Sequence, residues 1–248
     1  MARTTARNAA MRKPRNPDAS RADILRAATG EFAARGLDGA RIDSIARRTR
    51  TTRAMIYYYF ATKEGLYQAV LEEAYRGIRE AEKGLDLAHL PAREAIRELV
   101  SFTFDYYQAH PEFVALVVAE NQAGGGHLRR MPRVRRLNAS IVDTIRDVLE
   151  RGQREGAIRA GVDPVDLHMT IAALGWFEVA NRHTFGYLFK RDFAARPTIA
   201  RDRERIIDLV WRGVRSSREA ARDEARPRAA RAPRPAGPPR DLEAQAPD

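Results

Sequence analysis

Hydrophobic residues recur at helical spacing along most of the chain. In the first such segment Ile24, Ala28 and Phe32 share one face, Ser20 can cap the start, and Gly36 can end it. The alternation of apolar and polar residues that marks strands is missing. The pattern therefore predicts an all-α fold. We expect about nine helices, at residues 20–36, 42–48, 52–60, 62–84, 91–108, 111–122, 132–154, 163–185 and 197–215.

The two ends of the chain lack this periodicity. Residues 1–19 hold two prolines and five basic side chains, which predicts a flexible basic arm. Residues 216–248 hold six prolines and almost no large apolar groups, so they cannot bury enough surface to offset the entropy lost on ordering. We expect a disordered tail there, and a folded part made of one domain at 20–66 and another at 67–215.

The net charge of +11 is concentrated near the N-terminus. Residues 1–70 carry 14 basic and six acidic side chains, as a polyanion-binding domain on a nearly neutral body would. The chain has no cysteine and its five histidines lack metal-binding spacing, so we expect no disulfide, no metal and no cofactor. No apolar run is long enough to span a membrane and no secretory signal is present, which indicates a cytoplasmic protein.

Three short predicted helices at the N-terminal end, the third basic and aromatic, indicate a helix-turn-helix. In this motif the third helix lies in the major groove of DNA. Thr52 can cap that helix and donate to a phosphate, and Arg53 can reach a guanine edge. Tyr57 and Tyr59 carry hydroxyl groups suited to phosphates, and Lys63 begins a helix where a phosphate can dock.

The motif residues resemble the TetR family of bacterial transcription regulators. Residues 22–66 carry the resemblance in ILRAATGEFAARG, IDSIARR and TTRAMIYYYFATKEGL, with a dozen or more matches in register. Two positions depart from the family pattern. Arg41 stands where a capping Thr or Ser is usual. Arg50 stands where glycine is usual, so either it takes a left-handed conformation or the turn differs.

Both arginines could add phosphate contacts. For Tyr58, core packing is as good an interpretation as DNA contact. The basic arm, with Arg3, Arg7, Arg12, Lys13 and Arg15, could enter the minor groove or merely add non-specific affinity. The expected DNA contacts are Arg41, Arg50, Thr51, Thr52, Arg53, Tyr57, Tyr59 and Lys63.

The resemblance implies a C-terminal domain that binds a small-molecule effector and forms a homodimer. Apolar walls with a few polar groups are typical of such sites, although core packing is the commoner role for any single aromatic residue. The candidate effector contacts are Phe102, Tyr106, Phe113, Val117, Asn121, Trp176 and Asn181.

For the homodimer, the predicted helix 163–185 is apolar over more than one face. The helix 197–215 carries an apolar stripe of Ile206, Ile207, Val210, Trp211 and Val214. These eighth and ninth predicted helices from two subunits would make a four-helix bundle, as in the family. The two-fold axis would place two recognition helices about 34–36 Å apart on a palindromic operator.

We therefore expect a repressor that a small molecule releases from a double-stranded DNA operator. Two alternatives stay open. A non-specific DNA-packaging protein would explain the basic ends, but not a near-neutral body with an aromatic interior. An enzyme with a helical pocket is disfavoured because the sequence shows no G-x-S-x-G motif, phosphate-binding loop or paired carboxylates in an apolar context.

Overall fold

The computed structural model describes residues 17–225, so most of the predicted arm and tail lie outside the described residues. Within that range the chain forms eleven α-helices, one 3-10 turn and no strand, which confirms the all-α prediction. None of these helices is both long and apolar enough to cross a membrane. The helices are α1 (Pro17–Gly39), α2 (Ile42–Thr49), α3 (Arg53–Phe60), α4 (Lys63–Glu82), α5 (Ala92–Ala109), α6 (Pro111–Gln122), α7 (Pro132–Arg154), α8 (Pro164–Ala180), α9 (Arg182–Leu188), α10 (Arg196–Val214) and α11 (Ser217–Ala225).

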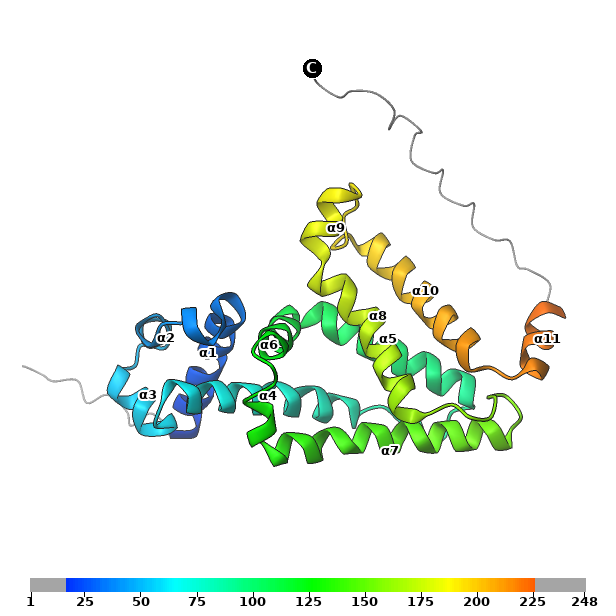
Figure 1. Ribbon diagram of the computed structural model, residues 1–248, viewed down its shortest axis with the longest axis horizontal. Coiled ribbons are helices and arrows are strands. Elements are labelled where there is room, and N and C mark those ends of the chain that lie inside the picture. Colours follow the sequence, from blue (N-terminus) through cyan, green and yellow to red (C-terminus); the bar gives the residue numbers. More distant parts are fainter. Residues whose placement is uncertain (1–16, 226–248) are drawn as a thin grey trace, which may run out of the picture.

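Helices α1–α3 form a head at one end of the molecule, and α4 leads from it into a body made of α5–α11 (Figure 1). The first helix presents Phe32 to Ile45 of α2 and Ile56 of α3, and all three side chains are buried. This head core continues into the body, because Leu116 of α6 and Val134 of α7 belong to it. The head is therefore packed against the body and not merely tethered to it.

Two further apolar clusters hold the body together. The larger one joins α5, α7, α8 and α10. The smaller one, called here the aromatic cluster, lies between α4, α5, α6 and α8. Its buried members are Ile78, Tyr107, Phe113, Val114 and Val179, with Ala74, Tyr75, Phe102, Tyr106, Val117 and Trp176 packed around them. Helix α6 thus contributes Leu116 to the head core and Phe113 to the aromatic cluster.

The long helix expected at 163–185 is interrupted at Asn181. This residue has a φ of −107° and a ψ of 8°, so α8 ends at Ala180 and α9 begins at Arg182. The side-chain amide of Asn181 donates to the carbonyl of Phe177 at 3.0 Å, beside the backbone bond to the same oxygen. Asparagine competes in this way with the regular helical hydrogen bonds, which favours a helix end.

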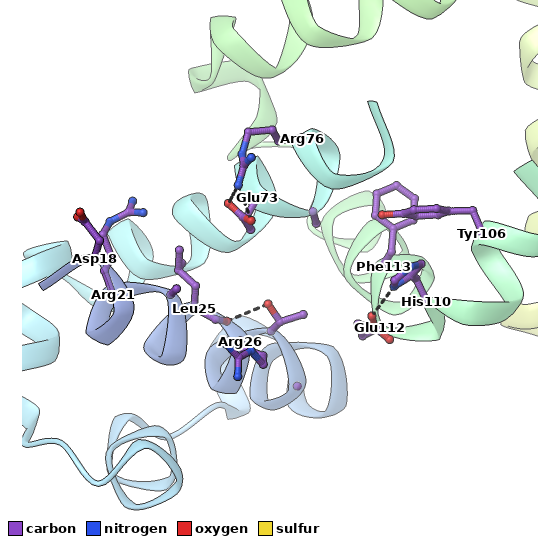
Figure 2. A pocket seen from close by; sticks show the side chains of 14 residues that line it. Asp18, Arg21, Leu25, Arg26, Glu73, Arg76, Tyr106, His110, Glu112 and Phe113 are labelled. Atoms are coloured by element: carbon purple, nitrogen blue, oxygen red, sulfur yellow. Dashed lines mark hydrogen bonds and ion pairs between the residues drawn. The ribbon is translucent and has the colours of Figure 1, made fainter. Parts of the chain in front are cut away.

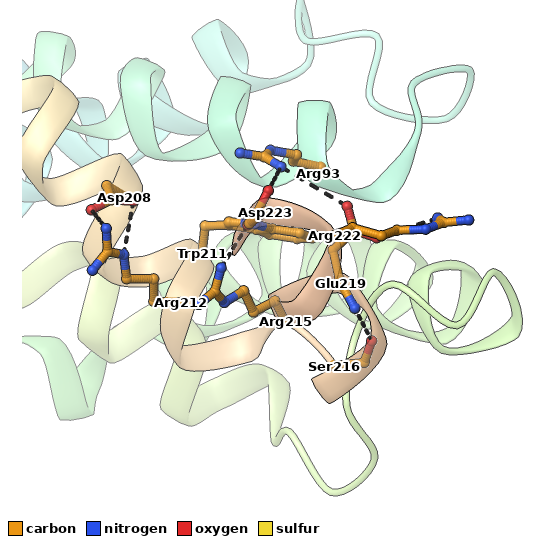
Figure 3. Close-up of polar contacts among 9 residues, drawn as sticks. All are labelled: Arg93, Asp208, Trp211, Arg212, Arg215, Ser216, Glu219, Arg222 and Asp223. Atoms are coloured by element: carbon orange, nitrogen blue, oxygen red, sulfur yellow. Dashed lines mark hydrogen bonds and ion pairs between the residues drawn. The ribbon is translucent and has the colours of Figure 1, made fainter. Parts of the chain in front are cut away.

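The tail expected from residue 216 to be disordered instead begins with helix α11. Ser216 accepts a hydrogen bond from the Glu219 amide at 3.2 Å and so caps this helix. Asp223 accepts hydrogen bonds from Arg93 of α5, from Arg215 and from the indole of Trp211 (Figure 3). Polar contacts to distant residues hold the helix in place, which a composition argument based on apolar burial does not detect.

Candidate functional site

The turn between α2 and α3 takes the first of the two conformations predicted for Arg50, the left-handed one. Arg50 adopts a φ of 53° and a ψ of 34°, and its amide donates to carbonyl groups of the last turn of α2. A non-glycine residue is disfavoured in this region by roughly 1–2 kcal/mol. Thr52 then caps α3 by accepting a hydrogen bond from the Met55 amide at 3.2 Å, as predicted. The turn therefore adopts the left-handed conformation with an arginine, at some cost in strain.

The start of α2 lacks a side-chain cap at Arg41, and Glu31 of α1 acts there in its place. The Glu31 carboxylate is 1% exposed and accepts hydrogen bonds from the Arg41 amide at 3.2 Å and the Ser44 hydroxyl at 2.9 Å. Arg35 and Arg48 approach it at 3.3 and 3.6 Å. Burial raises the pKa of Glu31, but these hydrogen bonds and charges outweigh burial and leave that pKa below its usual value. The ionised carboxylate therefore fixes α2 against α1.

The outer face of α3 is open to solvent. Ile56 and Phe60 are buried one turn apart, and they turn Tyr57 and Tyr58 outward. Tyr58 is 78% exposed, so its interpretation as a core residue is wrong. Tyr59 instead packs partly against the head core. The spacing of Ile56 and Phe60 was the signal in the sequence that could have placed Tyr58 on the outer face.

The other predicted DNA contacts lie around the same surface. Arg41, Arg50 and Thr52 are exposed and Thr51 is half-buried. Arg53 pairs with Asp43 of α2, with 3.3 Å between Nε and Oδ1. Both side chains are more than half exposed, so the pair is weak and the guanidinium can exchange this partner for another.

Lys63, another predicted DNA contact, makes a hydrogen bond within the protein. Its Nζ donates to the carbonyl of Asp38 at 3.1 Å and so ties the start of α4 to the end of α1.

Five of the seven candidate effector residues belong to the aromatic cluster: Phe102, Tyr106, Phe113, Val117 and Trp176. The other two, Asn121 and Asn181, lie outside it. Both are part of helix ends, and each side-chain amide donates to a carbonyl of its own helix, at 2.9 and 3.0 Å. The structure therefore brings together the apolar part of the predicted site, while the two amide groups hydrogen-bond to their own helices.

Tyr106 and Phe113 also line a pocket of about 710 Å³ between the head and the body (Figure 2). Leu25 of α1 lies on the opposite wall. The ion pair of Glu73 and Arg76 on α4 also lines the pocket, with 2.5 Å between the charged atoms, as do charged side chains of α1. A molecule in this pocket would touch α1 of the head and the aromatic cluster of the body at once.

The sequence analysis missed a group of buried polar residues beside the aromatic cluster. Arg79 of α4 is 5% exposed, and its Nη1 lies 2.9 Å from a carboxylate oxygen of Glu82. Burial raises the pKa of Glu82 to about 7, against the opposing effect of the Arg79 charge. Burial, with the same charge, lowers the pKa of His168 to about 4.

The helical spacing of α4 was the signal that could have found Arg79, because it directly follows buried Ile78 and lies eight residues after buried Leu71. Arg76, the other arginine of this helix, falls outside that face and is exposed.

The prediction that the apolar stripe of α10 forms the dimer is not met by the structure. The apolar stripe of that helix is buried against other helices of the same chain, so it does not form a free surface. Helix α8 instead exposes Val165, Met169 and Phe177, which are spaced at four and eight residues and share one face. Leu209 of α10 is also exposed.

A capped, solvent-facing helix in the second position of a helix-turn-helix, joined to a helical body, defines a DNA-binding regulator of the helix-turn-helix class. Residues 24–70 match the family model described as "Bacterial regulatory proteins, tetR family". Residues 93–210 match the one described as "Tetracyclin repressor-like, C-terminal domain". With the relatives below, these matches show that the chain belongs to the TetR family.

Two curated relatives carry names of transcriptional repressors. The repressor NicS of Pseudomonas putida is 37% identical over 198 residues, which cover 80% of this chain and 93% of NicS. The repressor SCO4008 of Streptomyces coelicolor is 35% identical over 165 residues, covering 65% of this chain and 80% of that protein. These names place the chain among transcriptional regulators.

Solved structures agree with the fold. The transcriptional regulator SCO4942 of Streptomyces coelicolor superposes with a TM-score of 0.60 at 28% identity, over 79% of this chain and 98% of that one. The FadR regulator of Bacillus subtilis, solved in complex with stearoyl-CoA, has a TM-score of 0.60 at 18% identity, over 77% and 98% of the two chains.

Proposed function

We propose that this protein is a repressor that binds a palindromic operator as a homodimer and leaves it when a small molecule binds the body. The observation that carries the proposal is the exposed outer face of α3, which is capped at Thr52 and flanked by exposed arginines. The repressor names of two relatives support it. In this proposal, residues 20–66 bind DNA, and residues 67–215 bind the effector and form the dimer.

The chemistry of the outer face suits DNA. Tyr57 and Tyr58 can donate to phosphates, while Arg53 at the first turn of α3 can turn from Asp43 to a guanine edge. Arg41 and Arg50 lie at the two ends of α2 and can add phosphate contacts. Phosphate contacts fix the position of the head, and base contacts give it sequence preference.

The exposed face of α8 is the surface that we assign to the dimer. Met169 is 61% exposed and Phe177 is 43% exposed, which is unusual for large apolar side chains unless a partner covers them. Leu209 of α10 is a further exposed apolar side chain. A two-fold contact through α8 and α10 would give the predicted four-helix bundle. The exposed faces of these helices would meet the partner subunit, whereas the apolar stripe of α10 would stay buried within its own chain.

Helices α4 and α6 can carry the effector signal to the head. Helix α6 places Phe113 in the aromatic cluster and Leu116 in the head core, and α4 does the same with Ile78 and Leu71. A ligand that separates the rings of the cluster shifts these helices, and with them α1–α3. A coupling of about 1–3 kcal/mol between effector and DNA is typical of such regulators and is enough to empty an operator.

The test is fluorescence anisotropy of labelled DNA from the region upstream of the gene, against scrambled DNA of equal length, across a salt series. We expect a salt dependence equivalent to about 6–10 phosphate contacts and a preference of about 1000-fold for the native sequence. Equal affinity for both DNAs would show that the protein does not read the sequence of the upstream region, as expected of a non-specific DNA-packaging protein. Selection of binding sites from random DNA then completes the test, since a packaging protein enriches no motif.

A pair of arginine variants separates base reading from general charge. Arg53→Ala should lose about 10–100-fold in preference for the operator, because one bidentate base contact is worth about 1–3 kcal/mol. Arg97→Ala is the matched control, since Arg97 is exposed and pairs with Glu204 as Arg53 pairs with Asp43, but lies on α5. An equal effect of both substitutions would contradict the assignment of α3 as the reading helix.

A further inference from the structure

Arg79 is a buried cation with an incomplete set of partners. Its side chain is 5% exposed, and its Nε and Nη1 atoms are buried without a hydrogen bond, although Nη1 lies 2.9 Å from Glu82. Three other arginines within residues 17–225 also bury an unpaired Nε, but each donates a hydrogen bond through an Nη atom. These are Arg151, Arg191 and Arg203. Arg79 is therefore the one that most lacks an acceptor.

Tyrosine hydroxyl groups lie near this guanidinium. The hydroxyl groups of Tyr75, Tyr106 and Tyr107 lie close enough to interact electrostatically with its charge. Phe113 stands at the centre of these rings, with Tyr75 edge-on at 5.5 Å and Tyr107 stacked at 5.9 Å. The cluster contains a second unpaired donor as well, because the buried indole Nε1 of Trp176 makes no hydrogen bond.

These donors are costly to the protein unless something else satisfies them. A buried donor without an acceptor loses its hydrogen bonds to water and regains none, and a buried charge adds its own desolvation. Glu82 is a weak counter-ion near neutral pH, since burial raises its pKa to about 7. His168 adds no charge to the site near neutral pH, because burial and the Arg79 charge lower its pKa to about 4. The site lacks a second anion.

We propose that Arg79 binds the carboxylate of an aromatic acid, which is the effector of this regulator. The proposal rests on the proposed function and names the chemical class of its ligand. A carboxylate fits because its two oxygens can accept from adjacent guanidinium N–H groups at once. An aromatic body fits because the rings of the aromatic cluster already pack on one another, Tyr75 edge-on and Tyr107 stacked against Phe113, and another ring can join them in either geometry.

Tyr106 connects this site to the pocket between head and body. Its ring lines the pocket, and its hydroxyl interacts with the charge of Arg79. The hydroxyl rests on α4 at Gly77, where an added Cβ would lie only 3.2 Å away. A turn of the Tyr106 side chain would open the pocket toward Arg79. An acid that enters there would move α5 against α4, and α4 leads directly into the head.

The test uses the full-length protein at pH 7.5 with three acids and their neutral amides. The pairs are benzoate with benzamide, phenylacetate with phenylacetamide, and cinnamate with cinnamamide. Binding is measured by calorimetry and by the rise in melting temperature. We expect at least one acid to bind about 10-fold or more tightly than its amide. Acids that bind no better than their amides, or none that binds below about 1 mM, would overturn the proposal.

Two variants on α4 locate the anion. Arg79→Gln should weaken binding of the acid by about 10–100-fold and leave the amide unchanged, as expected for the loss of charge-assisted hydrogen bonds. Arg76→Gln is the matched control, because Arg76 lies one turn away, lines the same pocket and is exposed. Loss of acid binding in Arg76→Gln alone would place the anion at the pocket rim and overturn the assignment.

A second measurement keeps the test decisive if Arg79→Gln does not fold. The side-chain Nε–H resonance of Arg79 in the wild-type protein, assigned by its absence in Arg79→Lys, should shift on titration with the acid and not with the amide. An unchanged resonance would refute the contact. Operator preference is measured separately without acid, so failure of the regulator function shows there, and failure of this inference shows only in the acid titrations.

Discussion

Glu31 gives the sharpest prediction about stability, because one buried carboxylate holds two helices of the head together. Replacing it by glutamine keeps the shape of the side chain but removes the charge that faces Arg35 and Arg48. The variant also offers one acceptor oxygen where the carboxylate offers two, to the Arg41 amide and the Ser44 hydroxyl. Glu31→Gln should therefore weaken the contact between α1 and α2.

The magnitude follows from the contacts. A hydrogen bond to a charged group contributes about 1.5–3 kcal/mol, and one of two such bonds is lost outright. The other becomes a neutral bond of about 1 kcal/mol. The ion pairs to Arg35 and Arg48 add little, since both arginine side chains are more than half exposed. We expect the free energy of unfolding to fall by about 2–5 kcal/mol.

The assay is urea unfolding followed by circular dichroism at one fixed protein concentration. Glu98→Gln is the control, because Glu98 is exposed on α5, and it should change the free energy of unfolding by less than about 0.5 kcal/mol. A Glu31→Gln variant as stable as this control would refute the role assigned to the carboxylate.

The pH dependence of the same pair gives an independent check. The folded-state pKa of Glu31 lies below the usual 4.5, so its stabilising effect is present above pH 4.5 and is lost as the pH falls through the folded value. The difference between wild type and Glu31→Gln should therefore be constant near neutral pH and shrink below about pH 4.5. A difference that grows on acidification would contradict this account.

Three further substitutions test the packing, the terminal helix and the dimer. Gly152→Ala should cost about 1–3 kcal/mol in unfolding free energy, because an added Cβ would lie 2.5 Å from Ile158; a more stable variant would contradict the packing. Asp223→Ala should release α11, seen as faster amide exchange at 217–225 with little change in melting temperature; unchanged exchange would argue against its anchoring role. Met169→Glu should shift the protein toward monomer in analytical ultracentrifugation, and an unchanged dimer would exclude this face of α8.

Local signals in the sequence determined much of the fold. Helix positions followed from the spacing of apolar residues, and Thr52 and Thr62 cap α3 and α4 as threonine before a helix usually does. The head could be predicted in this way because each of these signals acts within three or four residues along the chain. The left-handed Arg50 was one of two predicted outcomes, since the constraint on a tight turn is also local.

Only the tertiary structure decided which side chains lose contact with water and what they meet there. Glu31 acts on α2 from ten and thirteen residues away, and Asp223 accepts from Arg93 across the chain. Helical spacing places Arg79 on the inner face of α4, but only the packed structure shows which of its N–H groups lack an acceptor, and it shows that the α10 stripe faces inward. The physical reason is that periodicity and capping depend on neighbours along the helix, whereas burial and charge pairing depend on the helices that pack against it.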